Sequence, residues 1–264
     1  MKKLLSFLIW TTVAVLPLRA GDNFCGIRNN AFLDGERIDY DIFYSVIGLY
    51  VNAGNASFTT KLENLNNKPV YHVIGSGSSN TSYDWIFKVR DQYESYFDTA
   101  TLQPYKFIRN VNEGGFKIYE NVSFNQKTNT AITDKGVFKV PSCIQDVLSS
   151  IYYARNINYN AYKPEDKIPF NMFLDNEVHQ LYIKYMGKEK IKTRFGKFRA
   201  IKFKPLLVKG TIFEGGEGMT VWVSDDENHI PLRIESPIVV GSIKVDMMEY
   251  ENIRYPLSSL ISRR

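Results

Sequence analysis

Most of the chain alternates apolar and polar residues in steps of two, which is the pattern of half-buried β-strands. In residues 36–44, for example, Ile38, Tyr40 and Ile42 fall on one face. Further strand-like runs, by alternation or by β-branched and aromatic content, are 117–124, 180–185, 199–203 and 220–223. Turn residues separate such runs at 112–115, 134–136 and 215–218. The pattern predicts a mainly β protein, with an antiparallel curved sheet or a half-open β-barrel.

One segment, PSCIQDVLSSIYYARNI at 141–157, departs from this period. Ser142 can cap a helix, and Gln145 three residues later completes a capping box. The apolar residues that follow the 3.6-residue period form one stripe: Ile144, Val147, Leu148, Ile151 and Tyr152. We therefore expect one amphipathic helix over 142–156, packed on the concave face of the sheet.

The first twenty residues have the layout of a secretory signal peptide. Lys2 and Lys3 precede a mostly apolar stretch at 4–16, and the small residue Ala20 follows at the expected cleavage point. We expect a single exported β domain over 21–264, with no transmembrane segment after cleavage, because no later run reaches 18 apolar residues. The leader carries three basic residues and no acid, so the formal net charge of +5 falls to +2. This balance does not favour a nucleic-acid partner.

The two cysteines, Cys25 and Cys143, are expected to form a disulfide, because export places the chain in an oxidising compartment. The bridge would stabilise the fold by roughly 4–5 kcal/mol in the chain-entropy description. Two alternatives stay open: a pair of free thiols, or a reactive Cys143 activated at the start of the predicted helix.

An acidic stretch with a histidine, WVSDDENHIPLRIE at 222–235, raises the question of a metal or acid–base site. Its layout repeats that of YFDTATLQPYKFIR at 96–109. In both, an aspartate precedes a proline by six residues, as in Asp98 with Pro104 and Asp225 with Pro231. The aspartate can accept bonds from turn amides, and proline fits the first residue of the returning strand. Because the first copy needs neither a histidine nor a second acid, we interpret the stretch as a strand-to-strand turn.

Several segments together resemble a known family. GERIDYDIFY, AGNASF, YFDTATLQPYKF, CIQDVLSSIYYARNI, GKEKIKTRFGKFRAIKFKP and VWVSDDENHIPLRIESPIVVGSIKVDMMEYE occur in this order. The set, spanning about residues 31–256, resembles the bacterial exported family called domain of unknown function 3108. The resemblance implies an envelope protein dominated by antiparallel β structure and names no catalytic residues. The Asp–Pro–Arg strand pair also resembles the lipoprotein-localisation carriers of the Gram-negative periplasm, which are half-open β-barrels that hold acyl chains under a helical lid.

Other candidate chemistry is sparse. His72 and His179 lie inside strand patterns and lack the spacing of metal ligands, so we interpret both as strand residues that point outward or pair locally. No G-x-S-x-G elbow is present. The run at 75–79, GSGSS, is interpreted as a flexible connection. We expect no metal, no cofactor and no enzymatic activity.

Aromatic residues are the remaining signal. Tyr83, Trp85 and Phe87 alternate within 82–97, which places them on one face of a predicted strand. They can be core residues or the lining of an apolar groove. Together with the helix stripe they give the candidate ligand-binding set: Tyr83, Trp85, Phe87, Ile144, Leu148 and Ile151.

These observations support three hypotheses, in order of preference. The first is a non-catalytic binder or carrier of a hydrophobic envelope ligand such as a lipid or acyl chain. The second is an interaction or scaffolding module that docks another envelope protein through a strand edge or an apolar patch. The third is a hydrolase that uses His229 with Asp225 or Asp226.

Overall fold

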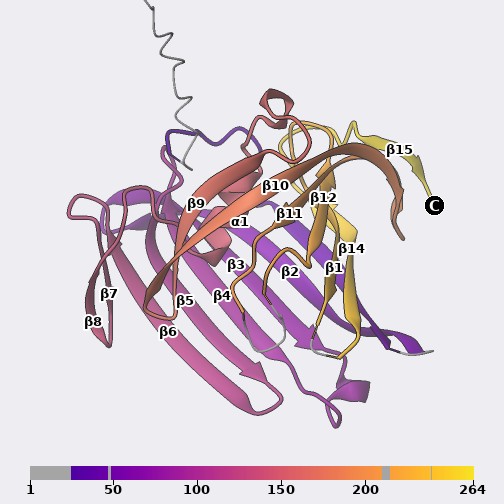
Figure 1. The fold of residues 1–264 in the computed structure, drawn as a ribbon, viewed down its shortest axis with the longest axis horizontal. Coiled ribbons are helices and arrows are strands. Elements are labelled where there is room, and N and C mark those ends of the chain that lie inside the picture. The colour runs from indigo at the N-terminus through magenta and orange to yellow at the C-terminus, as the bar shows by residue number, and fades with distance from the viewer. Residues whose placement is uncertain (1–24, 47–48, 210–214, 239) are drawn as a thin grey trace, which may run out of the picture.

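The computed structural model describes residues 25–46, 49–209, 215–238 and 240–264, and the predicted signal peptide at 1–20 lies outside them. Fifteen strands form one antiparallel sheet, with the order β8-β7-β6-β5-β4-β3-β2-β1-β14-β13-β12-β11-β10-β9 and with β15 paired to β11 (Figure 1). The strands are β1 Arg37–Val46, β2 Leu49–Leu65, β3 Lys68–Ser79, β4 Arg90–Asp98, β5 Pro104–Glu113, β6 Phe116–Asn125, β7 Thr130–Thr133, β8 Gly136–Lys139, β9 Lys167–Leu174, β10 Glu177–Lys192, β11 Gly196–Pro205, β12 Thr220–Ser224, β13 Pro231–Pro237, β14 Ser242–Glu251 and β15 Leu260–Arg263. Within the described ranges, three short helical elements complete the set, α1 Val147–Ala154 and the 3₁₀ turns η1 Thr81–Tyr83 and η2 Tyr159–Ala161. The mainly β, curved and unclosed sheet with one helix confirms the predicted fold class.

The connections of the sheet divide between two ends. At the hairpin end, in the lower part of Figure 1, lie the β3–β4 connection at 80–89 and the turns after β5, β7 and β9. At the helix end lie the turns 66–67, 99–103, 126–129, 193–195 and 225–230. The β5–β6 turn has the expected glycines, Gly114 and Gly115, with φ of 58° and 93°. Such left-handed backbone fits a two-residue hairpin.

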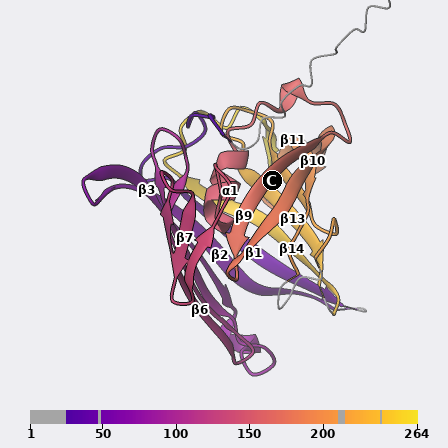
Figure 2. The same ribbon diagram turned by 60° about the vertical axis from the view of Figure 1, so that its left-hand side comes forward.

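The two edges of the open sheet approach each other, with β7 and β9 both labelled in the turned view of Figure 2, and side chains join them. The tip of the β9–β10 hairpin reaches β5, where Asp175 forms an ion pair with Arg109. It also reaches β7, where the hydroxyl of Thr133 donates to the side-chain oxygen of Asn176 at 2.7 Å. The sheet is thus barrel-like, with its edges joined by side chains rather than by a continuous backbone ladder.

The helix begins later than expected, so the Ser142–Gln145 capping box is wrong. Gln145 is extended, and its backbone N–H and C=O both bond to β9 at 2.9 Å. The cap is Asp146, whose side chain accepts from Ser149 N at 2.8 Å, while its own backbone N–H donates to Ser149 Oγ at 2.8 Å. Pairing with the sheet edge therefore takes the first residues of the predicted helix away from it.

The helix fills the inside of the curved sheet at the helix end. Leu148, Tyr152 and Tyr153 are fully buried in the main apolar cluster, which also contains residues of β3, β4 and β9–β12. The hydroxyl of Thr60 on β2 donates to Tyr152 Oη at 3.0 Å. At only eight residues α1 is short, and the described part of the chain contains no helix with the length and hydrophobicity needed to cross a bilayer.

The predicted disulfide is present. Cys25 and Cys143 are bonded, with their Cα atoms 5.5 Å apart and a sequence separation of 118. The bridge ties the segment before β1 to the segment that leads into α1. The alternatives of two free thiols or a reactive Cys143 are therefore wrong.

Two local predictions fail near the β3–β4 connection. Tyr83 belongs to η1, and Trp85 and Phe87 lie in the following turn, so they share no strand face. Local bonds favour the turn, because Asn80 caps η1 and Ile86 N donates to Tyr83 O at 2.9 Å. The run at 75–79 is no flexible connection, because it forms the last part of β3.

Candidate functional site

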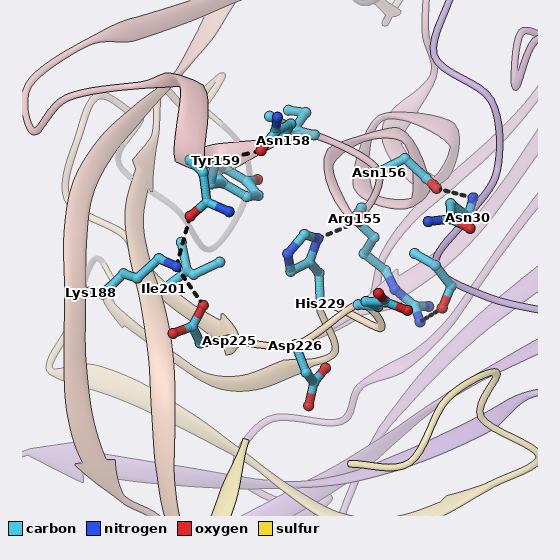
Figure 3. Close-up of a pocket in the computed structure, with 14 residues that line it drawn as sticks. Asn30, Arg155, Asn156, Asn158, Tyr159, Lys188, Ile201, Asp225, Asp226 and His229 are labelled. Carbon is cyan, nitrogen blue, oxygen red and sulfur yellow. Dashed lines mark hydrogen bonds and ion pairs between the residues drawn. The ribbon is translucent and has the colours of Figure 1, made fainter. Parts of the chain in front are cut away.

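A polar pocket of about 340 Å³ opens at the helix end, between the β12–β13 turn and the chain that follows α1 (Figure 3). Its lining is rich in amide and carboxylate side chains and comprises Asn30, Ala31, Arg155, Asn156, Ile157, Asn158, Tyr159, Asn160, Lys188, Ile201, Asp225, Asp226, Glu227 and His229. The acidic stretch singled out in the sequence therefore borders a pocket, although its backbone is the expected turn.

The turn forms as the repeated pattern predicts, but its accepting aspartate is not the predicted Asp225. In the first copy, Asp98 Oδ1 accepts from the backbone N–H groups of Ala100 and Thr101 at 2.9 and 2.8 Å. In the second copy, the accepting residue is Asp226 rather than Asp225. Its Oδ1 receives Asn228 N at 3.1 Å.

The repeat extends to the backbone of the two turns. Both returning strands start at the proline, Pro104 or Pro231. Two residues earlier, Leu102 and His229 both have left-handed backbone, with φ of 58° and 44°. The histidine thus occupies a position that the fold gives to leucine in the other copy, so the turn itself does not require its chemistry.

The two aspartates of the second turn are engaged elsewhere. Asp225 pairs with Lys188 at 2.8 Å, and Lys188 also donates to Asn160 Oδ1 at 2.9 Å. Asp226 accepts from Ser224 Oγ at 2.8 Å and from Ser259 N at 3.1 Å, which ties the turn to the C-terminal segment. Both carboxylates therefore have structural partners.

His229 is the histidine of the pocket lining. Its Nδ1 lies 2.6 Å from the backbone oxygen of Arg155, and a carbonyl only accepts, so Nδ1 carries the proton (Figure 3). Burial lowers the pKa of His229. The ring is therefore neutral at pH 7, and its Nε2 lone pair is an acceptor.

The geometry differs from the predicted pairing of His229 with Asp225 or Asp226. The residue that orients His229 is a backbone carbonyl, and neither Asp225 nor Asp226 takes that place. The fourteen lining residues include no serine, threonine or cysteine that could act as a nucleophile. Within the described ranges, no three His, Cys, Asp or Glu side chains gather closely enough to hold a metal ion. The pocket can accept and donate hydrogen bonds, and we assign it no reaction.

The other two histidines pair locally. His72 lies between two carboxylates, with Nδ1 3.1 Å from Glu63 and Nε2 3.0 Å from Glu94, and its ring stacks on Tyr96. His179 Nε2 lies 3.2 Å from the backbone oxygen of Leu174.

The candidate ligand-binding residues separate into two groups. Leu148 lies in the main cluster and Ile144 in a neighbouring one, both fully buried, and Ile151 packs against the main cluster. Tyr83, Trp85 and Phe87 lie at the hairpin end. The structure therefore does not bring the two groups together, and their role in ligand binding stays a prediction.

The sheet itself offers a second region, which the sequence did not mark. On its inner face, cross-strand pairing sets Phe58, Gly75 and Tyr93 in one row, and Gly75 faces Leu148 of the helix. The next row toward the hairpin end is Ala56, Gly77 and Asp91. A Cβ atom built on Gly77 would meet nothing within 4 Å. The inner face is therefore filled by α1 only as far as Gly75.

Polar groups border this open stretch on the β4–β6 side. Arg109 is buried and forms an ion pair with Glu120 at 3.0 Å. Burial, together with the neighbouring Glu113, raises the pKa of Asp91 to about 6. On the β1–β2 side the neighbours are Tyr40 and Phe58, whose rings meet edge-on at 5.8 Å. The open stretch is apolar on one side and charged on the other.

An open antiparallel sheet that curls into a barrel-like shape over one internal helix defines the structural class. The sequence matches the family described as "Protein of unknown function (DUF3108)" over residues 39–248. The chain therefore belongs to this family, as its motifs indicated. No curated protein matches the sequence.

Solved structures support the fold. A β-barrel-like protein of domain of unknown function DUF1849 from Brucella abortus has a TM-score of 0.57 at 9% identity, covering 86% of this chain and 99% of that chain. A candidate lipoprotein from Parabacteroides distasonis has a TM-score of 0.33 at 14% identity, covering 85% and 100% of the two chains. A candidate exported protein with a YmcC-like fold from Bacteroides fragilis has a TM-score of 0.33 at 11% identity, covering 86% and 99%. The first similarity shows the fold, and the other two support no inference.

Proposed function

We propose that this protein is a non-catalytic binding protein of the bacterial envelope, which takes an amphipathic molecule on the inner face of its sheet beyond α1. The observation that carries the proposal is the unfilled inner face at Gly77, where an added Cβ would meet nothing within 4 Å. Inner faces of small barrels are otherwise filled by side chains.

The two borders of this face define the ligand class. An apolar chain would lie along Ala56, Phe58 and Tyr93, where the strands carry aromatic or small side chains. A polar or charged head would lie near Asp91 and Arg109. Such a mixture of an apolar lining and a few placed polar groups is typical of small-molecule sites.

The proposed ligand site is not the space between α1 and the sheet. Leu148 and Tyr152 close that space by direct packing, so the helix acts as a plug at one end rather than as a lid. Location in the envelope is supported by the signal-peptide pattern and by the disulfide, since disulfides persist in oxidising compartments. The absence of catalysis is supported by the pocket at His229, whose neighbouring carboxylates have structural partners.

The test uses a fluorescent fatty acid as the probe, with lipid extraction and native mass spectrometry of the purified protein alongside. Gly77→Leu should weaken probe binding by about tenfold or more, because the new side chain fills the open stretch with roughly a leucine's worth of apolar volume. Ser76→Leu is the matched control, since the neighbouring residue on the same strand points to the opposite face and should leave binding unchanged.

Either of two results would overturn the proposal. One is a protein that neither binds the probe nor carries extractable lipid. The other is equal probe affinity for the Gly77→Leu and Ser76→Leu variants, which would place the binding site elsewhere.

A further inference from the structure

The hairpin end carries an apolar tip, formed by Trp85, Ile86, Phe87 and Phe116. Trp85 is 83% exposed and Ile86 63% exposed, and the other two are exposed as well. Among the described residues, exposed large apolar side chains toward the opposite end include Leu62, Ile132 and Ile261. Tryptophan and isoleucine at this exposure are unfavourable in water unless something covers them.

The tip is structured rather than loose. Asp84 binds Arg90 at 2.6 Å and accepts from Ser79 Oγ at 2.5 Å, which joins the two ends of the connection. The indole Nε1 of Trp85 donates to Ser82 O at 3.1 Å. These bonds keep the apolar side chains directed outward, so their exposure is part of the fold.

Two connections share the tip. Gly114 N in the β5–β6 turn donates to Lys88 O at 2.9 Å, and Val89 forms an isolated bridge with Glu113. The Phe87 ring lies directly on Gly114, where an added Cβ would overlap the ring. The β3–β4 connection and the β5–β6 hairpin therefore present one continuous surface.

The charge around the tip is positive. Lys88 and Lys117 are both exposed and flank the apolar side chains. The two acids in residues 80–89 and 113–117 are Asp84, which is paired with Arg90, and Glu113, which is buried. An apolar tip with flanking lysines is complementary to the surface of an anionic bilayer, where basic residues meet headgroups and tryptophan prefers the interface.

We propose that this tip docks the protein on an anionic lipid surface, with Trp85 and Ile86 inserted among the headgroups. The inference rests on the proposed function only for the location of the protein in the envelope. It adds a route for the ligand, because the hairpin end that would touch the bilayer is also the end at which the inner face is open.

Co-sedimentation with vesicles tests the docking. The protein should bind vesicles of phosphatidylethanolamine and phosphatidylglycerol and bind phosphatidylcholine vesicles weakly. The double variant Trp85→Ser/Ile86→Ser should bind at least roughly tenfold more weakly, because it loses the inserted apolar area. Leu62→Ser removes an exposed apolar side chain at the opposite end and should leave binding unchanged.

A charge variant tests the second half of the proposal. Lys88→Gln and Lys117→Gln should each weaken binding to the anionic vesicles by roughly fivefold. Lys127→Gln changes an exposed lysine at the helix end and should have no effect. All these side chains are exposed, so thermal unfolding of the variants should match that of the parent and exclude loss of folding as the cause.

Three results would overturn the docking: no binding to the anionic vesicles, equal binding of the Trp85→Ser/Ile86→Ser variant, or a photo-crosslinker at position 85 that joins one envelope protein and no lipid. The last result would assign the tip to a protein partner. Binding of the fluorescent fatty acid without vesicles should be unaffected by the tip variants, so failure of docking and failure of the proposed function are separable.

Discussion

Asp146 shows how one buried acid links the helix to the sheet. Its carboxylate accepts from Ser149 N at the start of α1 and from Ser95 Oγ on β4, at 2.8 and 2.6 Å. Burial raises the pKa of Asp146 from 3.8 to about 6, although these hydrogen bonds favour the charged form. Because the folded-state pKa is the higher one, the stability that this group contributes is complete below pH 4 and is lost as the pH rises through 6.

Asp146→Asn is therefore expected to change how the free energy of unfolding depends on pH more than it changes its overall magnitude. The amide keeps an acceptor for Ser149 N but does not titrate. Between pH 7 and pH 5 the parent should gain about 1 kcal/mol relative to the variant, as measured by urea unfolding at each pH. Asp146→Ala removes the acceptor and should cost about 1–3 kcal/mol at either pH. Parallel pH profiles of the parent and the Asn variant would contradict the assignment.

A second residue-scale prediction concerns the ion pair beneath the polar pocket. Arg155 binds Glu36 through both guanidinium nitrogens at 2.6 and 2.8 Å, and both side chains are buried. Glu36→Gln should lower the free energy of unfolding by about 3–5 kcal/mol, because it leaves a buried charge uncompensated. The exposed pair of Arg37 with Asp39 gives the control, since Arg37→Gln should leave the free energy of unfolding nearly unchanged. If Glu36→Gln and Arg37→Gln lowered the free energy of unfolding equally in denaturant titrations, burial would not set the energy of the pair.

At the scale of elements, the disulfide ties the residues before β1 to the start of α1. Cys25→Ser with Cys143→Ser should lower the free energy of unfolding by up to about 4–5 kcal/mol, because 118 residues are no longer closed into a loop. Thermal unfolding with and without reductant measures the effect. The parent should lose stability on reduction and the double variant should not, and an insensitive parent would mean that the bridge does not contribute.

Local sequence patterns predicted the elements but not where they meet. The stripe through Leu148 and Tyr152 gave the helix correctly, because periodicity reports which face is buried. It could not show that Gln145 joins the edge of β9, since that pairing depends on residues more than twenty positions away. Trp85 shows a different limit, since alternation suggested a strand although hydrogen bonds between close neighbours form a turn there.

The candidate site was less predictable than the fold. The turn at 225–230 was predicted from its repeat, because both copies place an accepting aspartate before a proline that starts the returning strand, although the acceptor is Asp226 rather than the expected Asp225. The pocket beside this turn was not predicted, because its lining residues, such as Asn30, Asn156 and Lys188, come from separate segments. The sequence around Gly77 predicted a flexible connection, because a run of glycine and serine is typical of linkers. Its place between two long strands, with an inner face that stays open, is a property of the assembled sheet.

The whole molecule is an open sheet, and we call the line where its two edges meet, near β5–β7 and the β9–β10 tip, the seam. Strands β1 to β3 have neighbours on both sides, whereas β8 pairs only with β7 among the described strands. Across the seam, the contacts include the Arg109–Asp175 ion pair and the Thr133–Asn176 hydrogen bond. Opening at the seam would widen the inner face without breaking the central ladder.

Hydrogen–deuterium exchange should therefore be fastest in β8 and at the β9–β10 tip, and slowest in β1 to β3, because local opening follows the number of backbone bonds that must break. Asp175→Ala removes a seam contact and should speed exchange at the tip while leaving β2 unchanged. If an amphipathic ligand lies on the inner face, adding the fluorescent fatty acid should slow exchange around Gly77 and leave β8 as it was. Uniform exchange across the sheet would instead describe a closed, evenly stable barrel, in which the ligand could not enter by way of the seam and the hairpin end would be its remaining route.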